Sequence, residues 1–162
     1  MTDEYYRMQA LKEAKKAFED DEIPIGAVVV VNEKIIARGH NMTERLNDPT
    51  AHAEMIALTS AFSFLGSKYL PEATLYITVE PCLMCVGAMF HARISRVVFG
   101  ASDYKTGTAG SVMNLFEEQR LNHHATVQGG VLAVECGTLL SQFFAARRAQ
   151  QRDRQPADGC FR

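Results

Sequence analysis

The chain has 162 residues, 47% hydrophobic and 22% charged, which is the composition of one globular domain able to bury a full core. These values exclude a disordered chain, and four cysteines are too few for a disulfide-stabilised miniprotein. Lysine and arginine total 17 against 19 acidic residues, a net charge of −2 that does not indicate a nucleic-acid-binding protein and does not exclude a local basic surface.

Two helices and two strands are predicted in the first half of the chain from hydrophobic periodicity and turn residues. The acidic residues before Pro24 are expected to end the first helix, and Asp48 or Thr50 is expected to cap the second. In chain order these elements are a helix over 3–20, strands over 25–31 and 35–38 joined by a turn at 32–34, and a helix over 51–64.

The second half is predicted to continue the alternation of strands and helices, with Pro81 as the first residue of one helix. In chain order we expect a strand over 74–79, a helix over 81–91, a strand over 97–100, a Gly-rich loop over 103–110, a short helix over 111–117, an extended segment at 126–128 and a helix over 135–154. This order predicts an α/β fold, a three-layer α/β/α single domain with a central mixed five-stranded sheet. The domain is expected to cover 1–154, and a flexible tail to follow at 155–162.

Two short segments carry residues that are typical of a metal site. His52 and Glu54 lie at the start of one predicted helix, and Cys82 and Cys85 at the start of another. Each helix follows a strand, so both N-termini can meet at one end of the sheet. Catalytic zinc takes three protein ligands of N and S type and keeps one position for water. His52, Cys82 and Cys85 supply three such ligands, which leaves Glu54 free to exchange protons.

Two other interpretations of these residues are open. A closed structural zinc site needs a fourth ligand, and none of the spare histidines or cysteines forms a pair with ligand spacing. A Cys-x-x-Cys redox pair would leave His52 and Glu54 without a role. Ligand count therefore favours the open catalytic site. The spare candidates for a fourth ligand are His40, His91, His123, His124, Cys136 and Cys160.

The His-x-Glu and Pro-Cys-x-x-Cys spacings match the signature of zinc nucleobase deaminases. The chain resembles the cytidine deaminase superfamily and, within it, the bacterial-type tRNA-specific adenosine deaminases. The resemblance covers nearly everything up to about Arg154. The zinc motifs indicate only the superfamily, whereas the Asp-x-Lys-x-Gly loop and the Phe-Phe-x-x-Arg-Arg segment favour the tRNA branch. The segments that carry the narrower resemblance lie at 23–30, 39–41, 47–54, 80–89, 93–101, 103–111 and 143–148.

The resemblance implies hydrolytic deamination of adenosine to inosine at the wobble position of a tRNA anticodon, with release of ammonia. It implies one Zn²⁺ per chain held by His52, Cys82 and Cys85, with Glu54 as the general acid and base. It also implies a homodimer that acts on an anticodon stem-loop. Two alternatives are kept: a deaminase of a free base or nucleoside of the guanine or cytosine type, and a structural zinc module without turnover.

The substrate contacts come from the resemblance, because each has a simpler structural interpretation. Asn41 suits a turn, the loop residues suit a solvated surface, the two phenylalanines suit the core, and the arginines suit a solvated helix face. The resemblance implies instead that Asn41 orients the target nucleoside and that the loop and last helix contact RNA. The implied contacts are Asn41, Asp103, Lys105, Thr106, Phe144, Arg147 and Arg148.

The chain is expected to be cytoplasmic, with no membrane partner. The residues after Met1 are charged and lack the apolar core of a signal peptide. The longest apolar run, at 25–31, is too short to span a bilayer. Reduced thiols are the default in that compartment, which agrees with cysteines that serve as metal ligands.

Overall fold

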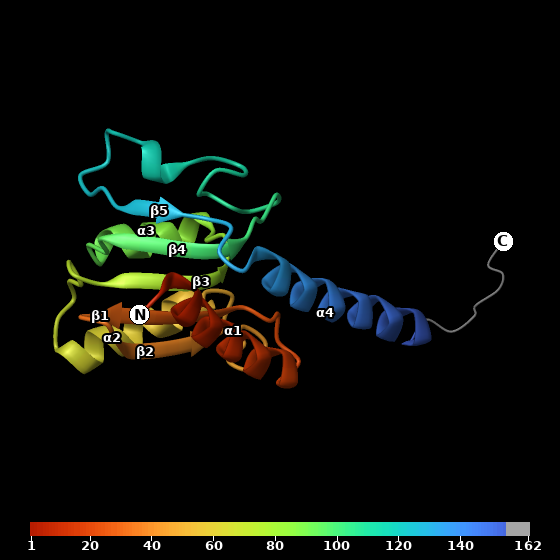
Figure 1. The fold of residues 1–162 in the computed structure, drawn as a ribbon. Coiled ribbons are helices and arrows are strands. Elements are labelled where there is room, and N and C mark those ends of the chain that lie inside the picture. Colours follow the sequence, from red (N-terminus) through yellow and green to blue (C-terminus); the bar gives the residue numbers. More distant parts are fainter. Residues whose placement is uncertain (155–162) are drawn as a thin grey trace.

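The computed structural model describes residues 1–154 and shows one sheet between two layers of helices (Figure 1). The predicted tail at 155–162 lies outside the described residues. The elements, in chain order, are α1 (Asp3–Glu19), β1 (Gly26–Val31), β2 (Lys34–His40), α2 (Ala53–Leu65), β3 (Thr74–Val79), α3 (Leu83–His91), β4 (Arg96–Ala101), the 3₁₀ turn η1 (Leu115–Glu117), β5 (Thr126–Gln128) and α4 (Ala133–Arg154).

The sheet has five strands in the order β2-β1-β3-β4-β5. β1 pairs antiparallel with both β2 and β3, whereas β3, β4 and β5 are parallel. The register sets Ala27 opposite Ile77 and Leu75 opposite Val97. The predicted mixed five-stranded sheet is therefore confirmed, and even the three-residue β5 takes part in it.

The strands are hydrophobic on both faces because helices cover both. Val29, Leu75 and Ile77 belong to the larger core cluster, which packs against α2 and α3. Val28 and Tyr76 alternate with them and pack against α1 on the opposite face. α4 starts on the α1 side and then runs outward beyond the sheet (Figure 1). This arrangement is the predicted α/β/α sandwich.

Two predicted helix starts are wrong by two residues each. α2 begins after His52, whose backbone is extended, and Asp48 accepts hydrogen bonds from the N–H and hydroxyl of Thr50 instead of capping the helix. α3 begins after Cys82, which is also extended, so Pro81 is not its first residue. In both cases the residue at the N-cap is a metal-ligand candidate, and its extended backbone keeps its side chain at the helix end.

The helix predicted over 111–117 is reduced to the 3₁₀ turn η1, capped by the Asn114 side chain. Ser111 and Val112, which precede it, are tied instead to earlier segments, because the Val112 N–H donates to the Gly107 carbonyl and Ser111 binds the carboxylate of Glu80. These tertiary hydrogen bonds compete with the helical ones and prevent a regular helix in this segment.

One end of the sheet collects the segments that carry polar residues. β2, β3 and β4 run in the same direction, so their carboxyl ends lie at the same edge. Asn41 follows β2, Cys82 follows β3, and Asp103 follows β4. Gly39 near the end of β2 allows close contact with α2, because a Cβ there would lie 2.5 Å from the carbonyl oxygen of Ala53. The fold thus brings the starts of α2 and α3 to this edge.

No helix within residues 1–154 combines the length and the apolar character needed to cross a membrane.

Candidate active site

Three side chains at the carboxyl edge of the sheet form a compact group of metal-ligand type. His52 is the N-cap of α2, Cys82 the N-cap of α3, and Cys85 lies in the first turn of α3. The Nδ1 atom of His52 is 3.6 Å from the Sγ of Cys82 and 3.5 Å from the Sγ of Cys85. All three candidate ligand atoms lie within 4.8 Å of one another.

This geometry fits tetrahedral zinc. Zn–S bonds of about 2.3 Å and Zn–N bonds of about 2.0 Å at tetrahedral angles set nitrogen and sulfur ligands roughly 3.5 Å apart. Within residues 1–154 no fourth His, Cys, Asp or Glu joins the group. Of the spare candidates, Cys136 contacts Arg7 and His123 contacts the Ile94 carbonyl, while Cys160 lies outside the described residues. The described donor set is therefore of the open, three-ligand kind typical of catalytic zinc.

The pKa shifts of these three side chains also favour the binding of a cation among them. A hydrogen bond with Cys85 and a second one with His52 lower the pKa of Cys82 to about 4. The hydrogen bond with Cys82, together with burial, raises the pKa of Cys85 above its usual range. The contact with Cys82 likewise raises the pKa of His52. One thiol therefore keeps a proton that is shared within the group, and a divalent cation would take its place.

Glu54 lies beside this group and is free of any hydrogen-bond partner at one oxygen. The residue is only 3% exposed, and its Oε2 atom is buried and unpaired within the described part of the chain. Burial is the main cause that raises the pKa of its carboxyl above the usual range. A carboxylate that is buried but not committed to a structural bond is suited to accept and return a proton.

His52, Cys82 and Glu54 line a cavity of about 520 Å³ at the edge of the sheet. Asn41, Asp103 and Thr106, for which the family resemblance implies substrate binding, also line it. Lys105, Phe144, Arg147 and Arg148 are not among the described residues that line it. The complete described lining is Ile23, Ile25, Asn41, Thr43, Glu44, Asn47, Asp48, Pro49, His52, Glu54, Val79, Glu80, Cys82, Asp103 and Thr106.

The loop after β4 is organised by acidic side chains. The carboxylate of Asp103 accepts hydrogen bonds from the backbone N–H groups of Lys105 and Thr106, at 3.0 and 3.1 Å, and from the Thr106 hydroxyl at 2.7 Å. These bonds fold 103–106 into a tight turn. Asp103 therefore shapes the loop, and the exposed Lys105 and Thr106 side chains stand on that turn.

Glu80 is a residue of the site to which the sequence analysis assigns no role. It is 3% exposed and accepts hydrogen bonds from the N–H groups of Asp103, Ala109 and Ser111, at 3.2, 3.0 and 3.1 Å, as well as from the Ser111 hydroxyl. It thus holds both ends of the loop against the Cys82 segment. An acid directly after a buried strand is the sequence signal, since a buried carboxylate must find donors.

The Gly107→Ala substitution is expected to displace this loop. A Cβ at Gly107 would overlap the carboxylate of Glu80, which cannot move without breaking its bonds to the loop. We expect zinc content to stay unchanged and kcat/KM to fall by about 10²-fold, because a displacement of about 1 Å in a reacting geometry costs that much. Steady-state kinetics with metal analysis checks this, and Gly137→Ala on α4, where an added Cβ meets no atom within 4 Å, is the control. Wild-type kinetics in Gly107→Ala would contradict it.

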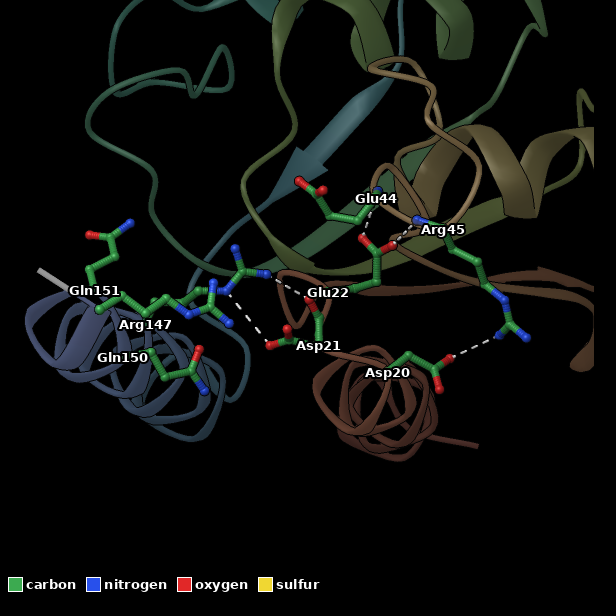
Figure 2. Close-up of a pocket in the computed structure, with 9 residues that line it drawn as sticks. Asp20, Asp21, Glu22, Glu44, Arg45, Arg147, Gln150 and Gln151 are labelled. Carbon is green, nitrogen blue, oxygen red and sulfur yellow. Dashed lines mark hydrogen bonds and ion pairs between the residues drawn. The ribbon is translucent and has the colours of Figure 1, made fainter.

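The three remaining predicted contacts lie on α4 and differ in how they are held. On α4, Phe143 is buried against Phe18, whereas Phe144 is 43% exposed. Arg147 is partly buried, and its Nη2 donates to the carbonyl oxygen of Asp21 at 2.7 Å (Figure 2). Its guanidinium lies over the Phe143 ring. Arg148 is exposed. Arg147 thus docks α4 onto the end of α1, while Phe144 and Arg148 stay accessible.

Comparisons with known proteins show which family this chain belongs to. A family model described as the cytidine and deoxycytidylate deaminase zinc-binding region matches residues 1–101. The chain is 51% identical over 150 residues to the tRNA-specific adenosine deaminase of Bacillus subtilis (strain 168), and the match covers 93% of each chain. A structure solved in studies of A-to-I editing by tRNA:A34 deaminases at the wobble position of transfer RNA superposes with a TM-score of 0.81 and 43% identity, covering 84% of this chain and 99% of that one. A guanine deaminase of Bacillus subtilis gives a TM-score of 0.62 and 32% identity, covering 91% of this chain and 95% of that one.

Proposed function

Because the chain belongs to the tRNA-specific adenosine deaminases, a family of the zinc-binding deaminases, we propose that it converts adenosine to inosine at the wobble position of a tRNA anticodon. The observation that carries the proposal is the open group of His52, Cys82 and Cys85 beside the unpaired oxygen of buried Glu54, at a cavity that His52, Cys82 and Glu54 line. A structural zinc module has no use for such a carboxylate.

The reaction is a hydrolysis in which adenosine and water give inosine and ammonia. His52, Cys82 and Cys85 would hold one Zn²⁺ per chain, which would act as the Lewis acid that makes water nucleophilic at neutral pH. Glu54 takes a proton from the water and gives it to N1 of adenine as the water oxygen bonds to C6. Glu54 then moves the remaining proton of that water from the oxygen on C6 to the amino group. The C6–N bond breaks, and ammonia leaves. Since burial raises the pKa of Glu54, the side chain can hold the proton between the two transfers.

The cavity and the surface around it suit a base presented on single-stranded RNA. A paired base cannot reach a group at the edge of the sheet, whereas an anticodon-loop base can be turned outward. Asn41, Asp103 and Thr106 line the cavity and are proposed to contact the target nucleotide and its neighbours. The exposed Lys105, Phe144 and Arg148 are proposed to bind flanking RNA, by charge and by stacking.

Arg148→Gln is expected to affect RNA binding, whereas Arg147→Gln is expected to affect the stability of the fold. If Arg148 contacts a phosphate, its loss should weaken binding and reduce the slope of log Kd against log salt by about one. Arg147→Gln should instead lower the thermal stability, because it breaks the bond to the Asp21 carbonyl that docks α4. Salt titrations of anticodon stem-loop binding and thermal unfolding of both variants check this. An unchanged salt slope in Arg148→Gln would contradict the phosphate contact.

A homodimer is proposed on the α2–α3 side of the molecule. Large apolar side chains are exposed there, and Leu83 directly follows the ligand Cys82, so a second copy on this side would border the site. Sedimentation equilibrium tests this, and a monomer throughout the micromolar range would contradict it. The exposed apolar residues are Phe64 at 67%, Leu65 at 44%, Tyr69 at 44% and Leu83 at 58%.

We place the enzyme in the cytoplasm. Cys82, Cys85 and Cys136 are free thiols in the structure, and thiols remain reduced in that compartment. Fractionation of the native host tests this placement, and recovery of the chain from an oxidising compartment would contradict it.

The second candidate function is deamination of a free base or nucleoside of the guanine or cytosine type, which the likeness to guanine deaminase favours. One experiment separates the two. Purified protein is incubated with an anticodon stem-loop that carries adenosine at the wobble position and, in parallel, with free adenosine, guanine and cytosine. Inosine formed only in the RNA supports the proposed function. Ammonia released only from a free base would overturn it and keep the zinc site.

A further inference from the structure

A buried carboxylate lies behind the cavity wall, outside the set of catalytic and ligand residues. Glu22, between α1 and β1, is only 1% exposed although its two neighbours in the chain are far more accessible. The turn that carries it is itself fixed, since the Glu22 N–H donates to the Ala17 carbonyl at 2.9 Å. Burial of a carboxylate is unfavourable unless donors surround it, so its partners show what it does.

The partners of Glu22 all come from the loop that follows β2. Its Oε1 accepts from the backbone N–H of Arg45 at 2.7 Å, and its Oε2 accepts from the N–H of Glu44 at 3.2 Å (Figure 2). Two longer contacts of 3.5 Å join Oε2 to the amide Nδ2 of Asn41 and to the hydroxyl of Thr43. One carboxylate thus ties down 41–45, the segment that forms one wall of the cavity.

The chemistry of these partners determines how Asn41 is oriented. An amide N–H₂ can donate to a carboxylate, whereas an amide oxygen cannot, so contact with Glu22 and Thr43 assigns the nitrogen of Asn41 to the loop side. The backbone of Asn41 is held independently, because its N–H donates to the Ile25 carbonyl at 3.0 Å. The amide oxygen is then the atom of this side chain that is left to accept a hydrogen bond from a ligand in the cavity.

We propose that Glu22 is a positioning residue that holds the 41–45 loop and orients the Asn41 amide for the substrate. This inference rests on the proposed function, because it takes Asn41 as a substrate contact. The Asp20 to Glu22 turn has a second link, since Arg147 of α4 binds the carbonyl of Asp21 (Figure 2). The same turn therefore connects the cavity wall to the helix that carries the exposed Phe144 and Arg148.

Glu22→Gln is the variant that tests the proposal. Its side chain has the same size, but it has one acceptor oxygen in place of two, and its amide nitrogen would face N–H donors. Glu19→Gln makes the same chemical change at an exposed residue three positions earlier and controls for the lost charge. We expect Glu22→Gln to keep its zinc and to lose between about 10- and 100-fold in kcat/KM on the RNA substrate. We expect Glu19→Gln to behave as wild type.

A double-mutant cycle with Asn41→Ala distinguishes positioning from a general structural role. If Glu22 acts through Asn41, adding Glu22→Gln to Asn41→Ala should cause little further loss of kcat/KM. Losses that multiply in the double variant would overturn the proposal. Glu22→Asp, which keeps two acceptor oxygens on a shorter stem, is expected to recover part of the activity that Glu22→Gln loses.

A second readout does not depend on activity. Amide hydrogen exchange at Glu44 and Arg45 should be faster in Glu22→Gln than in wild type and in Glu19→Gln, and the side-chain amide resonance of Asn41 should shift. Unchanged exchange and an unchanged Asn41 resonance would overturn the proposal. If the wild-type protein does not deaminate the RNA, the proposed function fails, and these two measurements still decide whether Glu22 holds the loop and the Asn41 amide.

Discussion

Glu54→Gln is expected to retain its zinc and to lower kcat by roughly 10²–10⁴, the usual contribution of a general acid and base. Glu54 is buried in the first turn of α2 beside His52, with one oxygen free of partners within the described chain. The amide of Gln fills the same space, but it can neither accept the proton from water nor return one to the amino group. The chemical step should fail while the fold and the ligand group stay intact.

Metal analysis and single-turnover kinetics on the RNA substrate check this expectation. Glu72→Gln, an exposed residue before β3 and therefore at the opposite end of that strand from the site, is the matched control and should leave kcat unchanged. If Glu54→Gln lost zinc together with activity, Glu54 would have a structural role in the site. If it kept both, another group would have to carry the protons.

Cys85→Ser is expected to abolish both zinc binding and turnover. Cys85 is completely buried at the base of the group, and its Sγ lies 3.5 Å from His52 Nδ1. Serine replaces a thiolate ligand by a hydroxyl that stays protonated and sits on a shorter bond. With only His52 and Cys82 left, two ligands remain where catalytic zinc takes three. Activity should fall to the level of chelator-treated wild type.

Metal content per chain and recovery of activity on zinc addition measure this effect. Stripped wild type should regain activity, whereas Cys85→Ser should not. Cys136→Ser, a change at a buried free cysteine outside the ligand group, should keep its zinc and is the control. A Cys85→Ser protein with one zinc per chain would contradict the assignment of this thiol.

The pH dependence of zinc binding follows from the same group. The pKa of Cys85 is raised by its contact with Cys82 and by burial, so this thiol carries a proton in the metal-free protein. A zinc ion must displace that proton, and binding should release protons and weaken as pH falls. Proton release on zinc addition is measured in weakly buffered solution with an indicator dye, and it should be observed with the wild-type protein.

The order of elements was predictable because hydrophobic periodicity and turn residues are local signals. The two errors at helix starts have a common cause. Helical propensity and Pro81 favour starts at 51 and 81, but His52 and Cys82 are extended N-caps, so the helices begin one residue after each. The short helix expected over 111–117 failed for another reason, since Glu80, which follows β3 and is distant in the chain, takes the N–H of Ser111.

The positions of the RNA-contact candidates show the limit of motif reasoning. Arg147 and Arg148 are adjacent in the sequence and have the same chemistry, yet one is docked on Asp21 and the other is exposed. Which of two neighbouring arginines is free depends on the rotation of α4 against α1. That rotation is decided by the packing of Phe143 on α4 against Phe18 on α1, and these two helices are far apart in the chain.

By itself the sequence predicted the chemistry: three candidate zinc ligands of N and S type, an acid beside them, and the family that these motifs resemble. These follow from residue identity and short spacing, which the chain carries locally. Only the tertiary structure decided that the candidate ligands come together at the N-terminal ends of α2 and α3. It also decided that Glu22 and Glu80 are buried and hold the two loops beside the cavity. A carboxylate has the same side chain whether it is solvated or buried, and its role depends on which backbone donors long-range folding brings to it.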